Sequence, residues 1–362
     1  MKAVMSMNTK TIIISSIGSP AGQGVVRCLR DTPNIRTIGL DANPKCPNKK
    51  AVDKFHVVPK VSDPAYLDVI HTIIAHECCD LFIPTIQPDL LVIDEIAKMT
   101  QVLSSKYEAI VVSSNKRVVY EKLVSSGLSA YVPNYFAFCS DEELTFDRLK
   151  QLAYPSKPVL IKPEKEHGGL AFKKIVLGTL DQVAQNLFAK KDHSWRTLNE
   201  LKELLKQCDP IKNLLAMEYL PGDEYSVDAL IMHDQVRIAV PRKRNRVSGG
   251  IVTHGIVERK EELIGATEKI LPVFGLEYFV NVQFKYAEDG LPKLIDINPR
   301  FCGSHIMSYG AGVNFPLLAV KAAFNEEVDF PEPRWGTQMT RYWESVFHDP
   351  ESNTTKDQGS HI

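Results

Sequence analysis

The sequence lacks the features that mark membrane and secreted proteins. Its longest apolar runs, such as Thr11–Ile14 and Ala109–Val112, are strand-length, whereas a helix that crosses a bilayer needs about 20 apolar residues. The N-terminal segment MKAVMSMNTK contains no long apolar stretch of the kind found in signal peptides. The 7 cysteines are an odd number without paired spacing. They indicate reduced thiols in the cytoplasm rather than a disulfide framework.

The sequence also has no excess of either charge. It contains 43 Lys and Arg residues against 44 Asp and Glu residues, which gives a net charge of -1. Nothing in that balance favours binding to nucleic acid or to an anionic membrane. A hydrophobic fraction of 44% and a charged fraction of 24% are those of an ordinary globular protein. We therefore expect an enzyme or a binding protein with one large or several smaller domains.

The first stretch of the chain alternates between expected strands and helices. The expected strands are Thr11–Ser15, Ile35–Leu40, Phe55–Pro59, Leu81–Pro84 and Ala109–Val112, and the expected helices are Gly22–Arg30, Pro64–Glu77 and Asp89–Met99. Asp63 is expected to cap the second of these helices, because a proline follows it. Repeated strand–helix units predict a parallel sheet that is covered on both faces.

The rest of the chain predicts a mixed α+β arrangement. In its first part we expect helices over Asn115–Ser126 and Glu142–Leu152, strands over Phe136–Phe138, Val159–Lys162 and Lys173–Leu177, and two amphipathic helices within Leu180–Gln207. In its second part we expect strands over Leu214–Leu220, Tyr225–Met232, Gln235–Pro241, Ile251–Glu258, Tyr278–Tyr286, Leu291–Ile297 and Thr337–Phe347, with helices over Glu261–Phe274 and Pro316–Phe324. The polar tail 348–362 is expected to be disordered, and residues 1–8 flexible.

The most informative pattern is a hairpin that joins the segments VQF and LIDINPR through a Glu-Asp-Gly turn. Alternate residues of a strand point to the same face, so Asp296 and Asn298 share a face and Gln283 can lie across from them. Three oxygen donors on one face suit Mg²⁺, with Mn²⁺ as an alternative. Arg300 continues the alternation and adds a positive charge suited to phosphoryl transfer. A hairpin whose polar face is simply satisfied is the structural alternative.

The segments VQF and LIDINPR resemble the metal-binding hairpin of ATP-grasp enzymes. The likeness is greatest to the synthetase unit of the carbamoyl-phosphate synthetase large subunit and to single-copy ATP-grasp carboxylate–amine ligases, and it extends over about Thr11–Glu327. It implies a Rossmann-like pre-ATP-grasp domain over 9–114 and a two-lobed ATP-grasp α+β domain over 115–347. The small lobe would span about 130–218 and the large lobe about 219–347. The family commonly has Glu where this chain has Asp296, which is one methylene shorter.

Further segments of the chain match ATP-grasp motifs, in the same order as in that family, and they imply an ATP site. Lys162 closes a strand, and a lysine there can reach phosphate oxygens, as the family's residue does. A surface lysine with its ammonium group in water is the alternative. The adjacent Gly168 and Gly169 allow backbone amides to approach phosphates closely, and they resemble the family's mobile loop. Lys116 matches a basic position that contacts the nucleotide.

The segment from Glu218 to Asp228 resembles the family's hinge. The resemblance assigns adenine to Glu218 and to the backbone of Tyr219 and Leu220, and it assigns the ribose to Glu224. The chemistry agrees, because adenine needs one donor and one acceptor in an apolar slot and a carboxylate accepts hydrogen bonds from two hydroxyls. Taken alone, the segment is better explained as two strands joined by a Pro-Gly turn.

The dense basic run that begins after Pro241 is the last candidate. In a strand, Arg242 and Arg244 share one face, where guanidinium groups can hold a carboxylate or an acyl-phosphate bidentately. We therefore expect Arg300, Arg242 and Arg244 to be catalytic. A solvated edge strand is the alternative. His254 on the following strand is a weaker candidate, because a single histidine is more often structural.

Together these features predict an ATP- and Mg²⁺-dependent carboxylate–amine ligase that acts through an acyl-phosphate and releases ADP and phosphate. Its partners would be a small carboxylate and an amine, amino acids among them, and a homodimer is one open form of assembly. The alternatives are a bicarbonate-activating unit of the carbamoyl-phosphate synthetase type, a nucleotide-binding protein without turnover, and an NAD-dependent dehydrogenase. The last is disfavoured, because three residues separate Gly18 from Gly22 where a dinucleotide fingerprint needs one.

Overall fold

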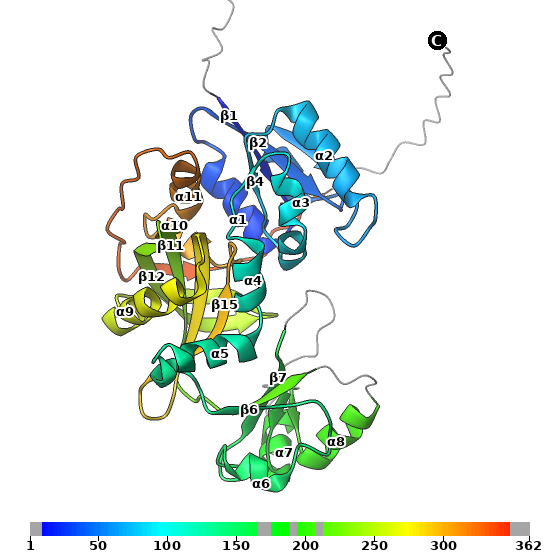
Figure 1. The fold of residues 1–362 in the computed structure, drawn as a ribbon, viewed down its shortest axis with the longest axis vertical. Coiled ribbons are helices and arrows are strands. Elements are labelled where there is room, and N and C mark those ends of the chain that lie inside the picture. The colour runs from blue at the N-terminus through cyan, green and yellow to red at the C-terminus, as the bar shows by residue number, and fades with distance from the viewer. Residues whose placement is uncertain (1–8, 166–174, 189–193, 208–212, 348–362) are drawn as a thin grey trace, which may run out of the picture.

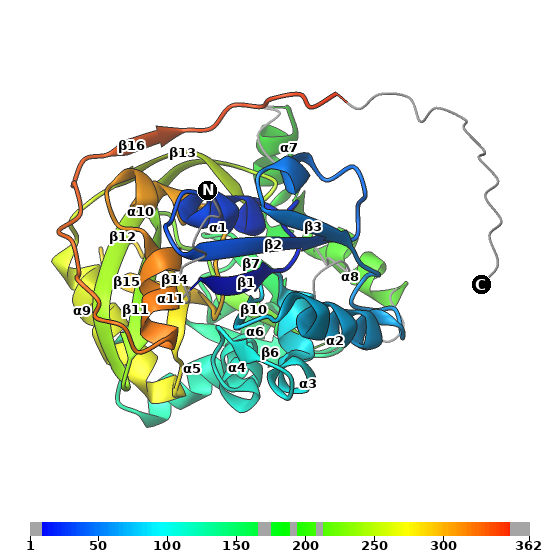
Figure 2. The ribbon, with the colours of Figure 1, turned by 90° about the horizontal axis from the view of Figure 1, so that it is seen from above.

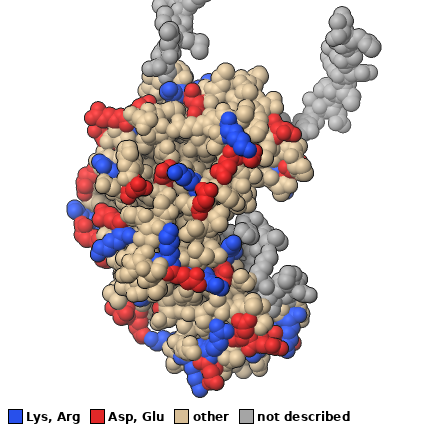
Figure 3. All heavy atoms as spheres, viewed as in Figure 1, with Lys and Arg blue, Asp and Glu red and all other residues tan. Residues whose placement is uncertain are grey.

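The chain folds around three β-sheets, each with its own helices (Figure 1). A computed structural model describes residues 9–165, 175–188, 194–207 and 213–347. Two of the sheets have 5 strands and the third has 6. None of the helices in these ranges has the length and hydropathy of a segment that crosses a bilayer. Basic and acidic side chains are interspersed over the face drawn in Figure 3, which is hollowed on one side.

The N-terminal sheet is parallel throughout and has the order β3-β2-β1-β4-β5. Its strands are β1 (Lys10–Ile14), β2 (Ile35–Asp41), β3 (Lys54–Val57), β4 (Leu81–Ile83) and β5 (Gln101–Val102), and its helices are α1 (Pro20–Leu29), α2 (Tyr66–Glu77) and α3 (Ile93–Ala97). Ile12 and Ile14 pack into the same cluster as Val25 of α1, whereas Ile13 packs with Ile70 of α2 on the other face. The prediction of a parallel sheet covered on both faces is confirmed.

Two expectations in this stretch were wrong, and a third was only partly right. The helix expected over Asp89–Met99 is a 3-10 helix, Gln87–Leu91, followed by the short α3. The run Ala109–Val112 is part of a helix, α4 (Tyr107–Ser113), and β5 is the strand that the sequence did not reveal. Ile110 is 1% exposed and Val111 is 40% exposed. A short β-branched run alone does not distinguish a buried strand from one turn of helix. Helix α2 begins at Tyr66, and the Asp63 carboxylate accepts from the Ala65 amide instead of capping the helix.

The second sheet forms a separate lobe, which lies at the bottom of Figure 1. Its strand order is β6-β10-β7-β8-β9. The strands are β6 (Tyr135–Phe138), β7 (Val159–Pro163), β8 (Ile175–Leu177), β9 (Trp195–Arg196) and β10 (Leu214–Glu218), and the helices are α6 (Phe146–Lys150), α7 (Leu180–Phe188) and α8 (Leu198–Lys206). Helix α6 is shorter than the helix expected over Glu142–Leu152. Helix α5 (Lys116–Ser125) leads into this lobe from α4, and Asn115 caps it.

The third sheet is antiparallel and has the order β15-β14-β11-β12-β13-β16. The strands are β11 (Glu224–Met232), β12 (Gln235–Ser248), β13 (Ile251–Val257), β14 (Tyr278–Tyr286), β15 (Pro292–Asn298) and β16 (Gln338–Thr340), and the helices are α9 (Glu261–Ile270), α10 (Ile306–Gly310) and α11 (Phe315–Ala323). The predicted hairpin is confirmed as β14 and β15. The final strand is shorter than the expected Thr337–Phe347, because only Gln338–Thr340 pairs with β13.

The N-terminal sheet and the third sheet share one hydrophobic cluster. It joins Ile12 and Val25 of the first to Phe279 and Phe315 of the second. Helix α1 packs against α10 and α11, which lie beside the large sheet in Figure 2. The other face of the large sheet packs under α9. The carboxyl ends of β1 and β4 are therefore held against the large sheet, and this position matters for the site.

A buried carboxylate in the N-terminal domain gathers basic side chains. The Glu77 side chain is 2% exposed, and it lies 2.6 Å from Arg36, 2.5 Å from Lys54 and 2.8 Å from His56. Burial raises the pKa of the Glu77 carboxyl, but hydrogen bonds from these groups and from His76 outweigh it and hold the pKa well below its usual range. The carboxylate therefore stays charged in the folded protein far into the acid range.

Glu77→Gln is expected to lower the free energy of unfolding at pH 7 by about 2 kcal/mol, since it leaves the basic groups around a neutral amide. Because the folded-state pKa is lowered, this stabilisation is present above the unfolded pKa of about 4.3 and is lost as the pH falls below it. Urea unfolding at pH 7, 5 and 3.5 should show the gap between the two proteins closing. Glu108→Gln, at an exposed position, is the control. A gap that is equal at every pH would contradict this account.

Candidate active site

The hairpin β14–β15 carries the three expected metal ligands on one sheet face. Gln283 lies directly opposite Asp296 in the register, and Asn281 lies opposite Asn298. The Asn298 amide donates to Asp296 Oδ2 at 3.0 Å, and the Gln283 amide donates to Asn281 Oδ1 at 3.5 Å. The side chain of Asp296 is 22% exposed. One carboxylate and two amides are thus close enough to act on one ligand.

Two lysines approach this hairpin from other elements. Lys116 is the first residue of α5, and its Nζ lies 3.3 Å from Asp296 Oδ1. Lys162 on β7 donates to the Ile295 carbonyl at 3.2 Å and to Tyr120 Oη at 3.3 Å. Both lysines are buried, at 6% and 7% exposure, so Lys162 is not a surface lysine that extends into water. Burial, together with the nearby Asp296, raises the pKa of Tyr120, so its hydroxyl stays protonated beside the ammonium group.

The expected adenine segment follows β10. Glu218 closes this strand, and its carboxylate accepts from the Asn134 backbone amide at 2.8 Å and from its side chain at 3.3 Å. Leu220 is 3% exposed within the hydrophobic core. The Tyr219 ring lies 6.5 Å from that of Trp195. These contacts occupy the Glu218 carboxylate and the Leu220 side chain, so the expected adenine contacts would fall to the backbone of residues 219 and 220. The predicted phosphate loop, Gly168 and Gly169, lies outside the described residues.

Glu224, the expected ribose ligand, forms an ion pair with Arg244, one of the arginines expected to bind the substrate. Glu224 Oε1 lies 3.1 Å from Arg244 Nε, and the Arg244 side chain is 8% exposed. The same guanidinium also donates to Ser226 Oγ at 3.4 Å and to the Gly250 carbonyl at 3.2 Å. Arg244 is therefore fixed in place, and part of its charge is offset by Glu224.

The position of Arg242 corrects the expectation that it grips the substrate directly. It is 0% exposed, and its Nη2 donates to Asp228 Oδ1 at 2.5 Å. Its Nη1 donates to the Ser304 carbonyl at 2.8 Å. Asp228 also accepts from Asn281 at 2.9 Å and from Ser308 at 2.7 Å. Alternation along a strand predicts which face a side chain takes, but not whether another segment covers that face. The signal for the partner is Asp228 itself, a carboxylate within an apolar strand.

A cavity of about 450 Å³ lies beside the hairpin, between the N-terminal domain and the large sheet. Arg300 lines it and donates to the Phe301 carbonyl at 3.1 Å. Its lining residues come from the start of α1, the end of β4, the sheet and the segment after β15: Ser19, Pro20, Ala21, Thr85, Ile86, Gln87, Pro88, Arg244, Gly250, Ile251, Val252, Gln283, Arg300, Cys302, Gly303 and Ser304. Gln283 belongs both to the cavity and to the hairpin face.

One buried group that supports this cavity was missed from the sequence. Asp89 is 0% exposed and accepts from Ser15 Oγ at 2.5 Å, from the Thr85 amide at 3.3 Å and from the Ile86 amide at 3.2 Å. Burial raises the pKa of its carboxyl, and these hydrogen bonds oppose that rise. The sequence places Asp89 only at the start of an expected helix. In the structure it lies in the 3-10 helix Gln87–Leu91, just after the cavity-lining residues Thr85 and Ile86. Asp89 thus fixes the backbone of Thr85 and Ile86 at the cavity wall.

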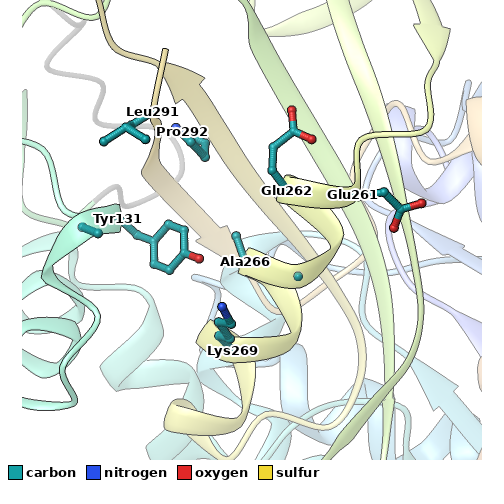
Figure 4. Close-up of a pocket in the computed structure, with 9 residues that line it drawn as sticks. Tyr131, Glu261, Glu262, Ala266, Lys269, Leu291 and Pro292 are labelled. Carbon is teal, nitrogen blue, oxygen red and sulfur yellow. The ribbon is translucent and has the colours of Figure 1, made fainter. Parts of the chain in front are cut away.

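A second cavity, of about 430 Å³, lies away from these groups, between α9 and the turn of the hairpin (Figure 4). In Figure 4 the Tyr131 ring points toward Ala266 and Lys269 of α9. None of the residues predicted for ATP or metal binding is among the described residues that line it.

The donor set of the hairpin decides which metal could be held there. Within the described ranges, no group of three or more His, Cys, Asp and Glu side chains could hold a metal ion. The hairpin instead offers one carboxylate and two amide oxygens. Such hard oxygen donors fit Mg²⁺, which keeps several waters and takes further ligands from phosphates. The residues present therefore fit a magnesium ion that arrives with a nucleotide.

Comparisons with known proteins agree with this geometry. Residues 210–344 match the family described as ATP-grasp in the biosynthetic pathway with Ter operon, and residues 12–106 match the PylC-like N-terminal domain. No curated protein sequence matches the chain.

Several solved structures have the same fold. An ADP complex of purK, N5-carboxyaminoimidazole ribonucleotide synthetase, is 16% identical, with a TM-score of 0.66 over 89% of this chain and 79% of that one. L-amino acid ligase from Bacillus licheniformis is 15% identical, with a TM-score of 0.66 over 89% and 76%. Biotin carboxylase from Campylobacter jejuni is 14% identical, with a TM-score of 0.67 over 91% and 74%.

The expected fold class is confirmed by these matches. A parallel N-terminal sheet is followed by two antiparallel-rich lobes, which are the parts of the ATP-grasp architecture. The chain therefore has the ATP-grasp fold, with a match to an ATP-grasp family over residues 210–344 and to a PylC-like N-terminal domain over residues 12–106.

Proposed function

We propose that this protein is an ATP- and Mg²⁺-dependent ligase that joins a small carboxylate to an amine. The observation that carries the proposal is the convergence of Lys116 and Lys162 on the hairpin that bears Asp296. Two buried ammonium groups beside one carboxylate suit a site for a phosphate chain and a divalent cation. The structural relatives support it, since they include a synthetase in complex with ADP and an amino acid ligase.

Each group has a distinct role in this proposal. Lys116 and Lys162 bind phosphate oxygens, together with the glycine loop at Gly168 and Gly169. The backbone of residues 219 and 220 binds adenine beside Glu218, and Glu224 binds the ribose. Asp296 holds the metal together with the amide oxygens of Gln283 and Asn298. Magnesium would supply charge neutralisation on the phosphates when bound.

The reaction we propose has two steps. A carboxylate oxygen attacks the γ-phosphorus of ATP and ADP leaves, which gives an acyl-phosphate. The nitrogen of an amine then attacks the acyl carbon, loses a proton, and phosphate leaves with the electrons of the broken C–O bond. Arg300 lies at the cavity beside the hairpin, where a fixed guanidinium can stabilise the developing negative charge. Arg244 positions the substrate from β12, and Arg242 acts only by holding the segment around Ser304.

Phosphate release is expected only when ATP, Mg²⁺, a carboxylate and an amine are all present. The test measures ADP and phosphate over a panel of carboxylates with pooled amines. EDTA should abolish phosphate release, because it removes the divalent cation that the reaction needs. Mg²⁺ or Mn²⁺ should restore release, because both ions accept hard oxygen ligands. Release with bicarbonate and ammonia alone would favour the carbamoyl-phosphate alternative. ATP binding without release for any pair would identify a nucleotide-binding protein without turnover.

A further inference from the structure

The cavity beside Arg300 is lined by two arginines and by no acidic side chain. Its polar lining consists of the arginines, hydroxyl groups and amides, and among the described residues that line it none is Asp or Glu. The two guanidinium groups are those of Arg244 and Arg300. The start of α1, which has no acidic residue in its first turn, adds the positive end of a helix dipole at the same wall.

Carboxylates that contact lining residues or their neighbours already have partners. Asp41 accepts from the backbone amides of Gly18 at 2.7 Å and Asn43 at 2.9 Å. Glu224 pairs with Arg244 at 3.1 Å, and Asp296 pairs with Lys116 at 3.3 Å. Asp89 lies behind the cavity wall, fully buried, and its oxygens accept from Ser15 and from backbone amides. Among the described residues that line the cavity, no acidic side chain is therefore available to receive a cation.

A substrate that carries an ammonium group would meet an unfavourable environment here. The ammonium would lose part of its hydration without gaining a carboxylate partner, which costs free energy. It would also lie near the guanidinium group of Arg300, and like charges repel in a partly desolvated site; Arg244 contributes less to this repulsion, because Glu224 offsets part of its charge. A carboxylate group is favoured in the cavity, because the Arg300 guanidinium can bind it.

The remaining wall of the cavity is apolar. Pro20, Ile86, Pro88, Ile251 and Val252 form this wall. An uncharged body with some apolar surface is favoured against such side chains. The cavity thus presents two guanidinium groups from the large-sheet side, together with apolar side chains from both the N-terminal domain and β13.

We infer that the cavity takes a carboxylate that bears no free ammonium group and has a partly apolar body, such as an N-acylated amino acid or a branched carboxylic acid. Free α-amino acids are poor acyl donors for this protein. The inference rests on the proposed ligase activity and specifies which half of the reaction the cavity serves: it binds the acyl donor and not the cationic form of the amine.

The test compares acyl donors with the same carbon skeleton. Hydroxylamine replaces the amine and traps the acyl-phosphate as a hydroxamate, so the natural amine need not be known. N-acetyl-leucine and 4-methylpentanoate are compared with leucine, and N-acetyl-alanine with alanine. The kcat/KM of each ammonium-free acid is expected to exceed that of the free amino acid by at least about tenfold, which corresponds to about 1.4 kcal/mol. Isothermal titration of the same acids in the presence of ADP provides a readout of binding.

A variant that adds a negative charge to the cavity wall tests whether the missing carboxylate causes the preference for acids without an ammonium group. Gln87→Glu puts a carboxylate of nearly the same shape on the cavity wall, and the Ser114 hydroxyl that now accepts from Gln87 at 3.2 Å can donate to it. The variant is expected to shift the preference toward free amino acids by about tenfold. Gln151→Glu, at an exposed position of the small lobe, is the control with the same change in charge and should leave the preference unaltered.

The outcomes separate the two proposals. Hydroxamate formation with leucine at a kcat/KM equal to that with N-acetyl-leucine overturns the inference and leaves the ligase activity standing. An unchanged preference in Gln87→Glu also overturns it, provided that the thermal stability of the variant matches that of the parent. Absence of hydroxamate with every acid, while ATP still binds, overturns the ligase proposal and the inference with it.

Discussion

Replacing Asp296 with asparagine is expected to slow ATP-dependent phosphate release by about 100- to 1,000-fold. Asp296 is the one carboxylate among the three predicted metal ligands on the hairpin, and neutral amides alone bind Mg²⁺ weakly. The change also removes the charge that holds Lys116 at 3.3 Å. The measurement is kcat at saturating ATP over a titration of MgCl₂, in which the half-saturating concentration of Mg²⁺ should rise. The fold should persist, because the side chain is 22% exposed.

Two further variants of the hairpin serve as controls. Glu288→Gln removes a carboxylate from the turn of the same hairpin, where Glu288 is exposed and pairs with Lys157; it should leave the rate within about twofold. Asp296→Glu restores the residue common in ATP-grasp enzymes and should retain activity, since the carboxylate is kept. If Asp296→Asn released phosphate at more than half the parent rate at the same Mg²⁺ concentration, the hairpin would have no part in the chemistry.

The parts of the site that were predictable are those that depend on strand alternation. The turn fixes the register of a hairpin, and the register fixes which side chains share a face. Asp296 and Asn298 were therefore placed on one face by alternation alone. Counted from the turn, Phe284 pairs with Leu294, which would put Gln283 opposite Ile295. A register shift between Gln283 and Phe284 brings Gln283 opposite Asp296, and the sequence did not predict that irregularity. Lys116 and Lys162 belong to α5 and β7, which are distant in sequence. Their approach to the hairpin depends on tertiary packing, and only the family resemblance indicated it.

The sequence could not predict how deeply a side chain is buried or which other segment of the chain covers it. Arg242 and Arg244 alternate on β12, yet one is fully buried against Asp228 and the other lines the cavity. The difference arises from the segment after β15, whose Ser304 carbonyl accepts from Arg242. The run Ala109–Val112 became a helix because the strand next to β4 is supplied by Gln101–Val102 instead. The deciding partner of Arg242 lies 62 residues away in the chain, whereas the strand that replaces Ala109–Val112 beside β4 lies just before it in sequence.

Replacing Arg242 with methionine is expected to lower the free energy of unfolding by about 3–5 kcal/mol, because it leaves the Asp228 carboxylate buried without its cation. Asp228 is 0% exposed and lies 2.5 Å from Arg242. Urea unfolding with an unchanged m-value measures the loss. Arg237→Met on the same strand, where Arg237 is exposed and lies 5.7 Å from the Phe330 ring, is the matched control. Its cost should stay within about 1 kcal/mol.

The double variant Arg242→Met with Asp228→Leu separates stability from positioning. Replacing both members of a buried ion pair with apolar groups is often neutral or stabilising, so much of the lost free energy should return. The carbonyl of Ser304 would still lack the donor that now lies 2.8 Å away, and the cavity wall at Ser304 would be less well fixed. We therefore expect the KM for the carboxylate to stay raised by about tenfold in the refolded double variant while the KM for ATP is unchanged. Recovery of both stability and the parent KM would show that Arg242 serves the fold alone.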